Sequence, residues 1–289
     1  MNIKVFQRGF NYSQDGDGNR LVYHLQGCNM RCLWCSNPEG VDIKGTLFVE
    51  PEWLIESVCP KGAIRDKKVN RKLCRDCKQR HCITEHTTKG IRLSYEEYDI
   101  KHIVEEIIGS RPMFFGNGGV TFTGGEPTLQ FDALKEILKE VKKQGIHTAI
   151  ETNASHMHLE ELFPYTDQLI MDCKQCYEVK HINATGISNR VIKENLIKAS
   201  RQHHNVNIRV PVIGGINDCL EDMEAFIEFF DTVKGDNVTF EALQYHEFGK
   251  KKWEQSGYIY TMKDGFVSNG KIKKFKEMMM ERGLHYKKT

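Results

Sequence analysis

Long apolar runs are missing from this 289-residue chain, and none approaches the roughly 20 residues that a membrane-spanning helix needs. The first ten residues, MNIKVFQRGF, lack the apolar centre of a signal peptide. An excess of one charge is missing too, because the formal net charge is only +2. These absences give no indication of a membrane or nucleic-acid partner, and we expect a cytoplasmic protein.

Internal repeats and low-complexity tracts are also absent, and short β-rich runs alternate with longer helical patterns. Strand patterns occur at 20–27, 119–125, 146–152, 168–174, 206–215 and 237–245. Helix patterns occur at 97–110, 129–145, 188–203, 217–234 and near 270–283. This alternation predicts an α/β protein with a parallel sheet. Six strands suggest an incomplete (β/α)6 TIM-type barrel, with its chemistry at the C-terminal ends of the strands.

One segment, residues 51–93, interrupts the alternation. It carries four cysteines and many basic residues, and it shows little regular periodicity. We therefore expect residues 1–50 and 94–289 to form the partial barrel. Residues 51–93 would form a small cysteine-rich, ferredoxin-like insert after the first predicted strand.

Cysteine, by contrast, is plentiful, with ten in the chain and seven of them between Cys28 and Cys82. Clustered cysteines in a reducing compartment usually indicate metal binding or catalysis. The stretch GCNMRCLWC (27–35) spaces three thiols as C-x3-C-x2-C. Three thiols on a [4Fe–4S] cluster leave one iron open to a ligand that is not protein. The alternative is a zinc site, which needs a fourth ligand such as Cys59 or a distant histidine.

The stretch TFTGGEPTLQ (121–130) closes a predicted strand with Gly-Gly-Glu-Pro. Glycines allow a ligand to approach the backbone closely, and Glu126 could accept hydrogen bonds from a positively charged amino group. The alternative is an ordinary turn followed by a helix that proline starts.

These two motifs resemble the signatures of the radical S-adenosylmethionine (SAM) superfamily, with Trp34 before the last cysteine of the triad. The opening block SQDGDGNRLVYHLQGCNMRCLWC (13–35) and five later blocks narrow the resemblance to the glycyl radical enzyme activating enzymes. It covers about residues 6 to 254 apart from the insert. The later blocks are ETN (151–153), DCKQ (172–175), NATGISNRVIKENL (183–196), RVPVIGGIND (209–218) and LQYHEFGKKKW (243–253).

The resemblance implies a role for individual residues. The cluster would be held by Cys28, Cys32 and Cys35. Trp34, Ser36 and Asn37 would lie beside the adenosine, and Gly124, Gly125 and Glu126 would take the methionyl part. Asp172, Lys174 and His246 would contact SAM, with Lys174 and His246 as the catalytic pair. A monovalent cation would be held by Glu151, Thr152 and Asp172. The alternatives are a surface lysine, a packed histidine and an aspartate cap.

Two departures from the family pattern stand out. The chain reads Asp15-Gly16-Asp17-Gly18 where the family usually has Asp-Gly-Pro-Gly, and Glu151 stands where some members have aspartate. The longer side chain of Glu151 would move the carboxylate outward by one methylene group.

The insert supplies Cys59 in VCPKGAI (58–64) and Cys74, Cys77 and Cys82 in CRDCKQRHC (74–82). In two-cluster ferredoxins, three cysteines of one run share a cluster with the last cysteine of the other run. This rule gives one complete set here, because TEH (84–86) lacks the closing cysteine of a second set. We therefore expect one auxiliary [4Fe–4S] cluster, with a structural zinc knuckle as the alternative.

Basic residues crowd the same insert. They form either a solvated face or a docking surface for an acidic electron donor such as flavodoxin or ferredoxin. They are Lys61, Arg65, Lys67, Lys68, Arg71, Lys72, Arg75, Lys78 and Arg80.

The resemblance finally implies an activity. A monomeric oxidoreductase of anaerobic metabolism would cleave SAM to a 5′-deoxyadenosyl radical. That radical would abstract a hydrogen from a glycine Cα in the C-terminal loop of a partner glycyl radical enzyme. The alternatives are a radical SAM enzyme that acts on a small molecule or another peptide, and a non-catalytic zinc or nucleic-acid-binding module.

Overall fold

The structure is a computed structural model, and it describes residues 1–289 except 12–13, 75–76, 79, 85–89 and 288–289. Within the described residues, no helix is both long enough and apolar enough to cross a bilayer. The predictions that concern Arg75 and residues 85–86 of the TEH stretch lie outside the described residues.

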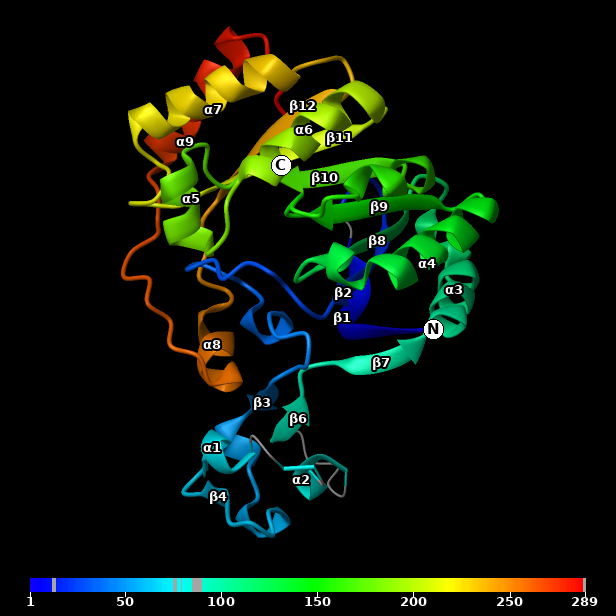
Figure 1. Cartoon of the computed structure of the whole chain (residues 1–289), viewed down its shortest axis with the longest axis vertical. Helices are drawn as coiled ribbons and strands as arrows, with labels where there is room; N and C mark the ends of the chain where they lie inside the picture. The colour runs from blue at the N-terminus through cyan, green and yellow to red at the C-terminus, as the bar shows by residue number, and fades with distance from the viewer. Residues whose placement is uncertain (12–13, 75–76, 79, 85–89, 288–289) are drawn as a thin grey trace.

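The described chain is organised around one eight-stranded sheet, in the order β12-β11-β10-β9-β8-β2-β1-β7 (Figure 1). The strands are β1 (Asn2–Asn11), β2 (Arg20–Leu25), β7 (Glu96–Asp99), β8 (Gly119–Gly124), β9 (His147–Thr152), β10 (Gln168–Asp172), β11 (Val206–Val212) and β12 (Val238–Gln244). From β2 to β12 neighbouring strands are parallel, whereas β1 is antiparallel to both β2 and β7. The six predicted parallel strands and the incomplete barrel are therefore confirmed.

Helices connect the strands, and most of them cover the outer face of the sheet, whereas α8 lies against β3 and η1 (Figure 1). They are α3 (Ile100–Gly109), α4 (Phe131–Lys143), α5 (Glu178–Thr185), α6 (Arg190–Gln202), α7 (Leu220–Val233), α8 (Lys250–Ser256) and α9 (Asn269–Glu281). Short 3-10 helices add η1 (Pro38–Gly40), η4 (Arg111–Phe114), η5 (Pro127–Gln130) and η6 (Leu159–Tyr165).

The prediction of one helix over 97–110 is wrong in its first turn. Residues 96–99 form β7, because their backbone pairs with Asn2–Val5 of β1. The helix begins only after Asp99, whose side chain accepts a hydrogen bond from the backbone N–H of Lys101 at 2.8 Å. This is the usual way in which an aspartate caps the start of a helix.

The insert is joined to the barrel by β3 (Leu47–Val49) and β6 (Ile91–Leu93), which pair antiparallel. Between them lie the hairpin β4 (Ile64–Arg65) and β5 (Lys68–Val69), helices α1 (Arg71–Cys74) and α2 (His81–Thr84), and 3-10 turns η2 (Pro51–Trp53) and η3 (Glu56–Val58). In Figure 1 this part projects from the lower side of the barrel. It follows β2, which is the strand that was predicted as the first, whereas β1 was not predicted.

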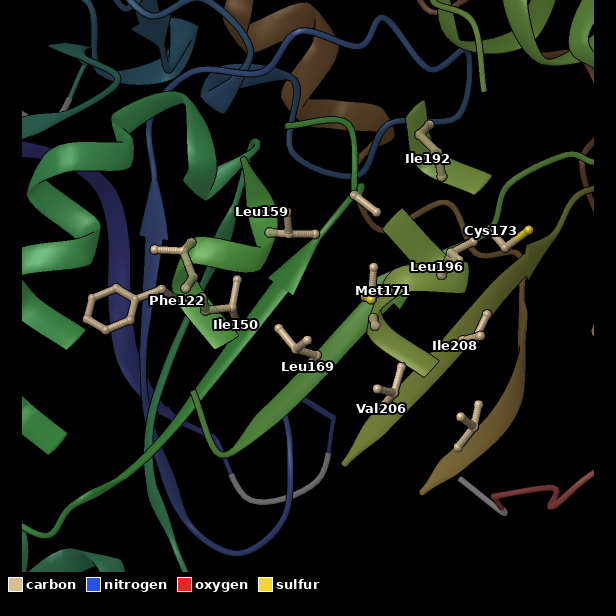
Figure 2. Packing of buried hydrophobic residues seen from close by; sticks show 14 of the residues in the cluster. Phe122, Ile150, Leu159, Leu169, Met171, Cys173, Ile192, Leu196, Val206 and Ile208 are labelled. Atoms are coloured by element: carbon tan, nitrogen blue, oxygen red, sulfur yellow. The ribbon is translucent and has the colours of Figure 1, made fainter. Parts of the chain in front are cut away.

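The apolar core lies between the outer face of the parallel strands and the helices. Figure 2 shows Ile150, Leu169 and Ile208 from three neighbouring strands packed with Leu159 and Leu196 from the helical layer, and all five are fully buried. Helix α4 buries Leu134, Ile137, Leu138 and Val141 at the helical spacing that places them on one face. This packing holds the strands rigidly, so their C-terminal ends can position a site.

The inner face of the barrel is polar. Side chains alternate across a strand, so Arg20, Thr121 and His147 share the inner face of β2, β8 and β9. The fully buried guanidinium of Arg20 donates to Thr121 Oγ1 at 2.6 Å and lies 3.2 Å from His147 Nδ1. This layer lies where the parallel strands begin.

The loop before β2 enters the same space. The backbone N–H of Asp17 donates to Gln168 Oε1 at 3.2 Å, the Asp17 carbonyl accepts from Arg20 at 3.0 Å, and Thr121 donates to the Asp15 carbonyl at 2.5 Å. Groups of the chain itself therefore fill the barrel where the strands begin. A ligand has the opposite end available, at the C-terminal ends of the strands.

Candidate active site

The three thiols of Cys28, Cys32 and Cys35 lie on the loop that follows β2, at the C-terminal ends of the parallel strands. All three cysteines are half-buried. The loop backbone is anchored on one side where the Cys28 N–H donates to the Val41 carbonyl at 2.9 Å. It is anchored on the other side where the Leu33 N–H donates to the Ala184 carbonyl of α5 at 3.1 Å.

Burial, together with another cysteine of the triad, raises the pKa of each of these thiols to about 12. The ammonium of Lys174 acts in the opposite direction on all three. The ammonium of Lys174 thus favours the charged form of all three thiols. Such thiols need nearby positive charge to ionise, and the iron of a cluster provides it, so the donor set fits a [4Fe–4S] cluster.

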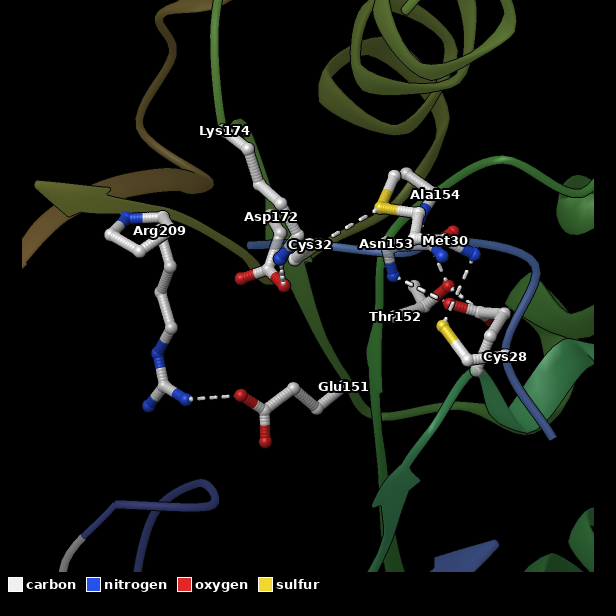
Figure 3. Close-up of polar contacts among 12 residues, drawn as sticks. Cys28, Met30, Cys32, Glu151, Thr152, Asn153, Ala154, Asp172, Lys174 and Arg209 are labelled. Atoms are coloured by element: carbon white, nitrogen blue, oxygen red, sulfur yellow. Dashed lines mark hydrogen bonds and ion pairs between the residues drawn. The ribbon is translucent and has the colours of Figure 1, made fainter. Parts of the chain in front are cut away.

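Asp172 and Lys174 form an ion pair at the end of β10, close to Cys32 (Figure 3). Their side chains are only 20% and 12% exposed. Burial alone would lower the pKa of Lys174, but Asp172 and the thiols of Cys32 and Cys28 outweigh burial and raise it. The low exposure argues against the surface-lysine alternative. Contact of either residue with SAM stays a prediction.

Glu126 joins the ends of β8 and β9. Its fully buried carboxylate accepts hydrogen bonds from the backbone N–H of Thr128 at 3.1 Å, the Thr152 hydroxyl at 2.7 Å and the Asn153 N–H at 2.7 Å. The Thr128 hydroxyl adds another at 2.5 Å. Burial raises the pKa of Glu126, while these donors favour its charged form. Glu126 thus positions two strand ends, and its predicted contact with the SAM amine stays a prediction.

Gly124 and Gly125 are required by the chain's own backbone. Gly124 has a φ of +115°, and a Cβ on Gly125 would lie 2.1 Å from the carbonyl oxygen of Gly27, next to the first cysteine. The Gly125 N–H also donates to the Leu25 carbonyl at 3.0 Å. These glycines let the β8 turn pack against the start of the thiol loop, whatever ligand approaches them.

Replacing Gly125 with alanine should therefore disturb both the fold and the site. We expect the free energy of unfolding to fall by about 1–3 kcal/mol, as for other overpacked positions, and SAM affinity to fall with it. Chemical denaturation and equilibrium SAM binding would measure the two effects. Gly109→Ala is the matched control, because nothing lies within 4 Å of a Cβ there. Equal behaviour of the two variants would contradict this account.

The residues predicted to hold a monovalent cation already have protein partners. Glu151 Oε1 accepts from Arg209 Nη1 at 3.0 Å (Figure 3), and Glu151 Oε2 accepts from the Thr123 hydroxyl at 3.0 Å. The Thr152 hydroxyl donates to Glu126, and Asp172 pairs with Lys174. Glu151 and Thr152 are neighbours on one strand, so their side chains point to opposite faces. The cation assignment stays a prediction.

The residues predicted beside the adenosine, Trp34, Ser36 and Asn37, lie on the thiol loop. Trp34 is buried against Ala184, Ile213 and Tyr245, whereas Ser36 and Asn37 are half-buried. His246 lies just beyond β12, exposed, with its ring stacked on Phe248 at 4.4 Å between centroids. This exposure argues against the packed-histidine alternative.

The four insert cysteines are half-buried and influence one another. Burial raises the pKa of Cys82, and its neighbours Cys59, Cys74 and Cys77 raise it further. The pKa of Cys74 is raised in the same way by burial, Cys59 and Cys77. The thiols of Cys59, Cys74 and Cys77 thus influence the charge of Cys82, and the auxiliary cluster stays a prediction.

No group of three or more His, Cys, Asp or Glu side chains is gathered as a metal site in the described ranges. This finding applies to the triad, the insert cysteines and the predicted cation ligands alike. The assignment of each of these residues as a metal ligand therefore stays a prediction.

The basic residues of the insert divide into two kinds. Lys61, Arg65 and Lys68 are exposed and line a surface hollow of about 480 Å³. Arg71 instead donates to the carbonyls of Leu47 and Gln255, which ties the insert to α8. Arg71 is therefore half-buried and does not belong to a solvated face.

Sequence reasoning missed other residues of the site. The guanidinium of Arg209 spans Glu151 and Glu241 inside the barrel, and Trp253 and Lys252 of α8 contact the thiol loop. All three lie in the sequence blocks quoted above, RVPVIGGIND and LQYHEFGKKKW. Their position in blocks that resemble the family was the only indication in the sequence that they matter, and it did not indicate what each residue does.

Comparison with known proteins agrees with this geometry. Residues 22–230 match the family model described as the radical SAM superfamily. The chain is 32% identical to the 4-hydroxyphenylacetate decarboxylase activating enzyme of Clostridioides difficile (strain 630), over 93% of this chain and 90% of the relative. It is 32% identical to the choline trimethylamine-lyase activating enzyme of Oleidesulfovibrio alaskensis, over 86% of this chain and 85% of the relative.

A solved domain of a pyruvate-formate lyase-activating enzyme from Bacteroides vulgatus is also similar. It matches with a TM-score of 0.50 and 25% identity, and the match covers 59% of this chain and 98% of that domain. The chain therefore belongs to the radical SAM superfamily and, within it, to the activating enzymes of glycyl radical enzymes. It is an oxidoreductase whose cofactors are SAM and a cysteine-bound [4Fe–4S] cluster.

Proposed function

We propose that the protein uses SAM and a reduced [4Fe–4S] cluster to abstract a hydrogen atom from a glycine Cα in the C-terminal loop of a partner glycyl radical enzyme. When bound, the cluster supplies the electron that breaks the S–C5′ bond of SAM into methionine and a 5′-deoxyadenosyl radical. The observation that carries this proposal is the thiol triad beside the buried Asp172–Lys174 pair, in a chain similar to activating enzymes over most of its length.

The chain's own residues hold this site in place. Lys174 provides a buried positive charge beside the thiols, and Asp172 fixes its direction. Glu126 locks the ends of β8 and β9, which places Gly124 and Gly125 against the start of the thiol loop. We assign SAM contact to Lys174, Asp172, His246 and the Gly-Gly-Glu motif. Polar groups fill the barrel at the strand starts, so the partner loop would enter from the other end.

We also propose that residues 51–93 form a ferredoxin-like part with one auxiliary [4Fe–4S] cluster on Cys59, Cys74, Cys77 and Cys82. The mutual electrostatic influence of these thiols supports this proposal. The exposed bases Lys61, Arg65 and Lys68 would dock an acidic flavodoxin or ferredoxin, because opposite charges steer association. Thiol ligands need a reducing compartment, so we place the protein, as a monomer, in the cytoplasm.

The decisive experiment is activation of a partner. The anaerobically reconstituted protein is mixed with SAM, a reductant and a candidate glycyl radical enzyme. We expect a glycine-centred EPR doublet in the partner and cleavage of the partner chain when oxygen is admitted. A partner in which that glycine is replaced by alanine is the control. SAM cleavage without a doublet in any glycyl radical enzyme would favour a small-molecule or other peptide substrate instead.

A further inference from the structure

The short helix α8 lies between the thiol loop and the insert (Figure 1). It contacts η1, at the end of the thiol loop, and β3, one of the two strands that join the insert to the barrel. On the loop side, the indole Nε1–H of Trp253 donates to the carbonyl oxygen of Cys35 at 2.8 Å. Lys252 Nζ donates to Asn37 Oδ1 at 2.9 Å. A Cβ on Gly249, just before the helix, would lie 2.5 Å from Ser36 Cα. The last cysteine of the triad and the two residues after it are therefore held by one helix.

Lys252 also compensates a buried charge. Its ammonium lies 2.7 Å from Glu39 Oε1, and the Glu39 side chain is only 5% exposed. The second carboxylate oxygen, Glu39 Oε2, is buried without a hydrogen-bond partner among the described residues. A buried carboxylate needs a paired cation, so this ion pair fixes η1 and, through it, the end of the thiol loop.

The other end of α8 is bound by the insert. Arg71 Nη2 donates to the carbonyl of Gln255 at 2.8 Å, and Arg71 Nη1 donates to the carbonyl of Leu47 at 2.6 Å. The Thr46 hydroxyl donates to the Ser256 carbonyl at 3.2 Å. Arg71 opens helix α1, which ends at Cys74. One helix thus connects the Cys35 segment with the segment that carries the insert cysteines.

We propose that Trp253 and Lys252 are positioning residues that set the Cys35–Asn37 segment for SAM binding, and that Arg71 fixes the insert to the same helix at a constant distance from that segment. The proposal rests on the proposed function, because it assumes that SAM binds at the triad. Neither Trp253 nor Lys252 needs to touch SAM, since both act through the backbone of Cys35 and the side chains of Asn37 and Glu39.

The first test uses Trp253→Phe and Lys252→Met in the reconstituted protein. Phenylalanine keeps an aromatic ring beside Tyr260, whose ring centroid is 5.3 Å from that of Trp253, but removes the indole N–H. Because one hydrogen bond is lost, we expect the Kd for SAM to rise by about threefold to tenfold. We expect the SAM-induced change in the EPR spectrum of the reduced cluster to weaken in parallel. Lys251→Met, on the exposed side of the same helix, is the control.

Iron content and thermal midpoint separate positioning from general destabilisation. We expect Trp253→Phe to keep the wild-type iron content and midpoint while SAM affinity and the spectral change decline. Variants that bind SAM like Lys251→Met would overturn the proposal, as would a loss of iron that accounts for the whole effect. The proposed function fails separately, if the wild-type protein does not cleave SAM at all.

The second test replaces Arg71 with methionine and uses the exposed neighbour Lys72→Met as its control. Two paramagnetic clusters at a fixed distance alter each other's EPR relaxation, so the power saturation of the triad cluster reports that distance. We expect Arg71→Met to change the saturation behaviour while SAM affinity stays at the wild-type value. Identical saturation in Arg71→Met and Lys72→Met, with the iron of two clusters present in both, would overturn the role of Arg71.

Discussion

Arg209→Met is expected to lower the free energy of unfolding by about 3–5 kcal/mol, which is the usual cost of leaving a buried charge without its partner. The guanidinium is only 6% exposed, and it lies 3.0 Å from Glu151 Oε1 and 2.7 Å from Glu241 Oε2. It also donates to the backbone carbonyl of Gln14, in the loop that fills the barrel. The variant therefore removes the cation that joins three strands and this loop. Anaerobic chemical denaturation measures the change.

Arg190→Met is the matched control, because Arg190 pairs with Glu178 at 2.9 Å but its side chain is 77% exposed. Exposed ion pairs contribute about 0–1 kcal/mol, so this variant should differ little from the wild type. Adding Glu151→Gln to Arg209→Met should recover part of the lost stability, since it removes one of the uncompensated charges. Equal losses in Arg209→Met and Arg190→Met would show that the inner ion pairs are not stabilising the barrel.

The same variant should also be pH-sensitive. Burial raises the pKa of Glu151 to about 7 in spite of Arg209, which lowers it. Removing Arg209 raises the pKa of Glu151 further. When an acidic group has a higher pKa in the folded protein than in the unfolded chain, the protein loses stability as the pH rises towards the folded-state pKa. The stability deficit of Arg209→Met should thus be larger at pH 8 than at pH 6, and a deficit independent of pH would contradict this explanation.

Removing either set of cysteines should remove about half of the bound iron, with different consequences for activity. Alanine at Cys28, Cys32 and Cys35 should abolish formation of 5′-deoxyadenosine with any reductant. Alanine at Cys59, Cys74, Cys77 and Cys82 should leave SAM cleavage driven by dithionite largely intact. It should slow cleavage driven by a protein donor, because a donor docked on the basic residues of the insert would no longer meet a cluster there. Iron analysis and chromatography of the nucleoside products measure both effects.

Cys219→Ala is the control for the cysteine variants, because Cys219 is exposed and lies outside both sets. Circular dichroism would verify that the insert variant keeps the barrel, which is joined to the insert mainly through β3 and β6. Zinc in place of iron in the wild-type protein would contradict the prediction for the corresponding set. Full iron content after loss of the four insert cysteines would exclude the auxiliary cluster.

The barrel could be predicted from sequence because its parallel strands are short β-rich runs between helical patterns. Strand β7 could not, since Glu96–Asp99 is acidic and becomes a strand only by pairing with Asn2–Val5. Strand β1 was missed for a related reason. Its first half alternates between buried and more exposed residues, but one of its two pairing partners, β7, is distant in the chain. Non-local pairing of this kind leaves little trace in a local pattern.

The residues of the site also differ in whether the sequence could predict them. The spacing of three cysteines is a local signal, so Cys28, Cys32 and Cys35 could be named with the chemistry that they indicate. The contacts of Arg209 with Glu151, Lys252 with Asn37 and Trp253 with Cys35 span 58, 215 and 218 residues of sequence. No periodicity or spacing encodes such contacts, and only the folded chain reveals them.

The edges of the main sheet have a consequence for how its width can change. In the described chain the sheet runs from β12 to β7, and these two strands are not hydrogen-bonded neighbours. The open side of β12 is instead covered by the C-terminal residues, because the Phe240 N–H donates to the His285 carbonyl and the Lys287 N–H donates to the Phe240 carbonyl, both at 2.8 Å. Lys287 also pairs at 2.7 Å with Asp17, in the loop before β2. Any widening of the sheet at this edge would therefore break these contacts, and faster deuterium exchange at the amides of Phe240 and Lys287 would report it.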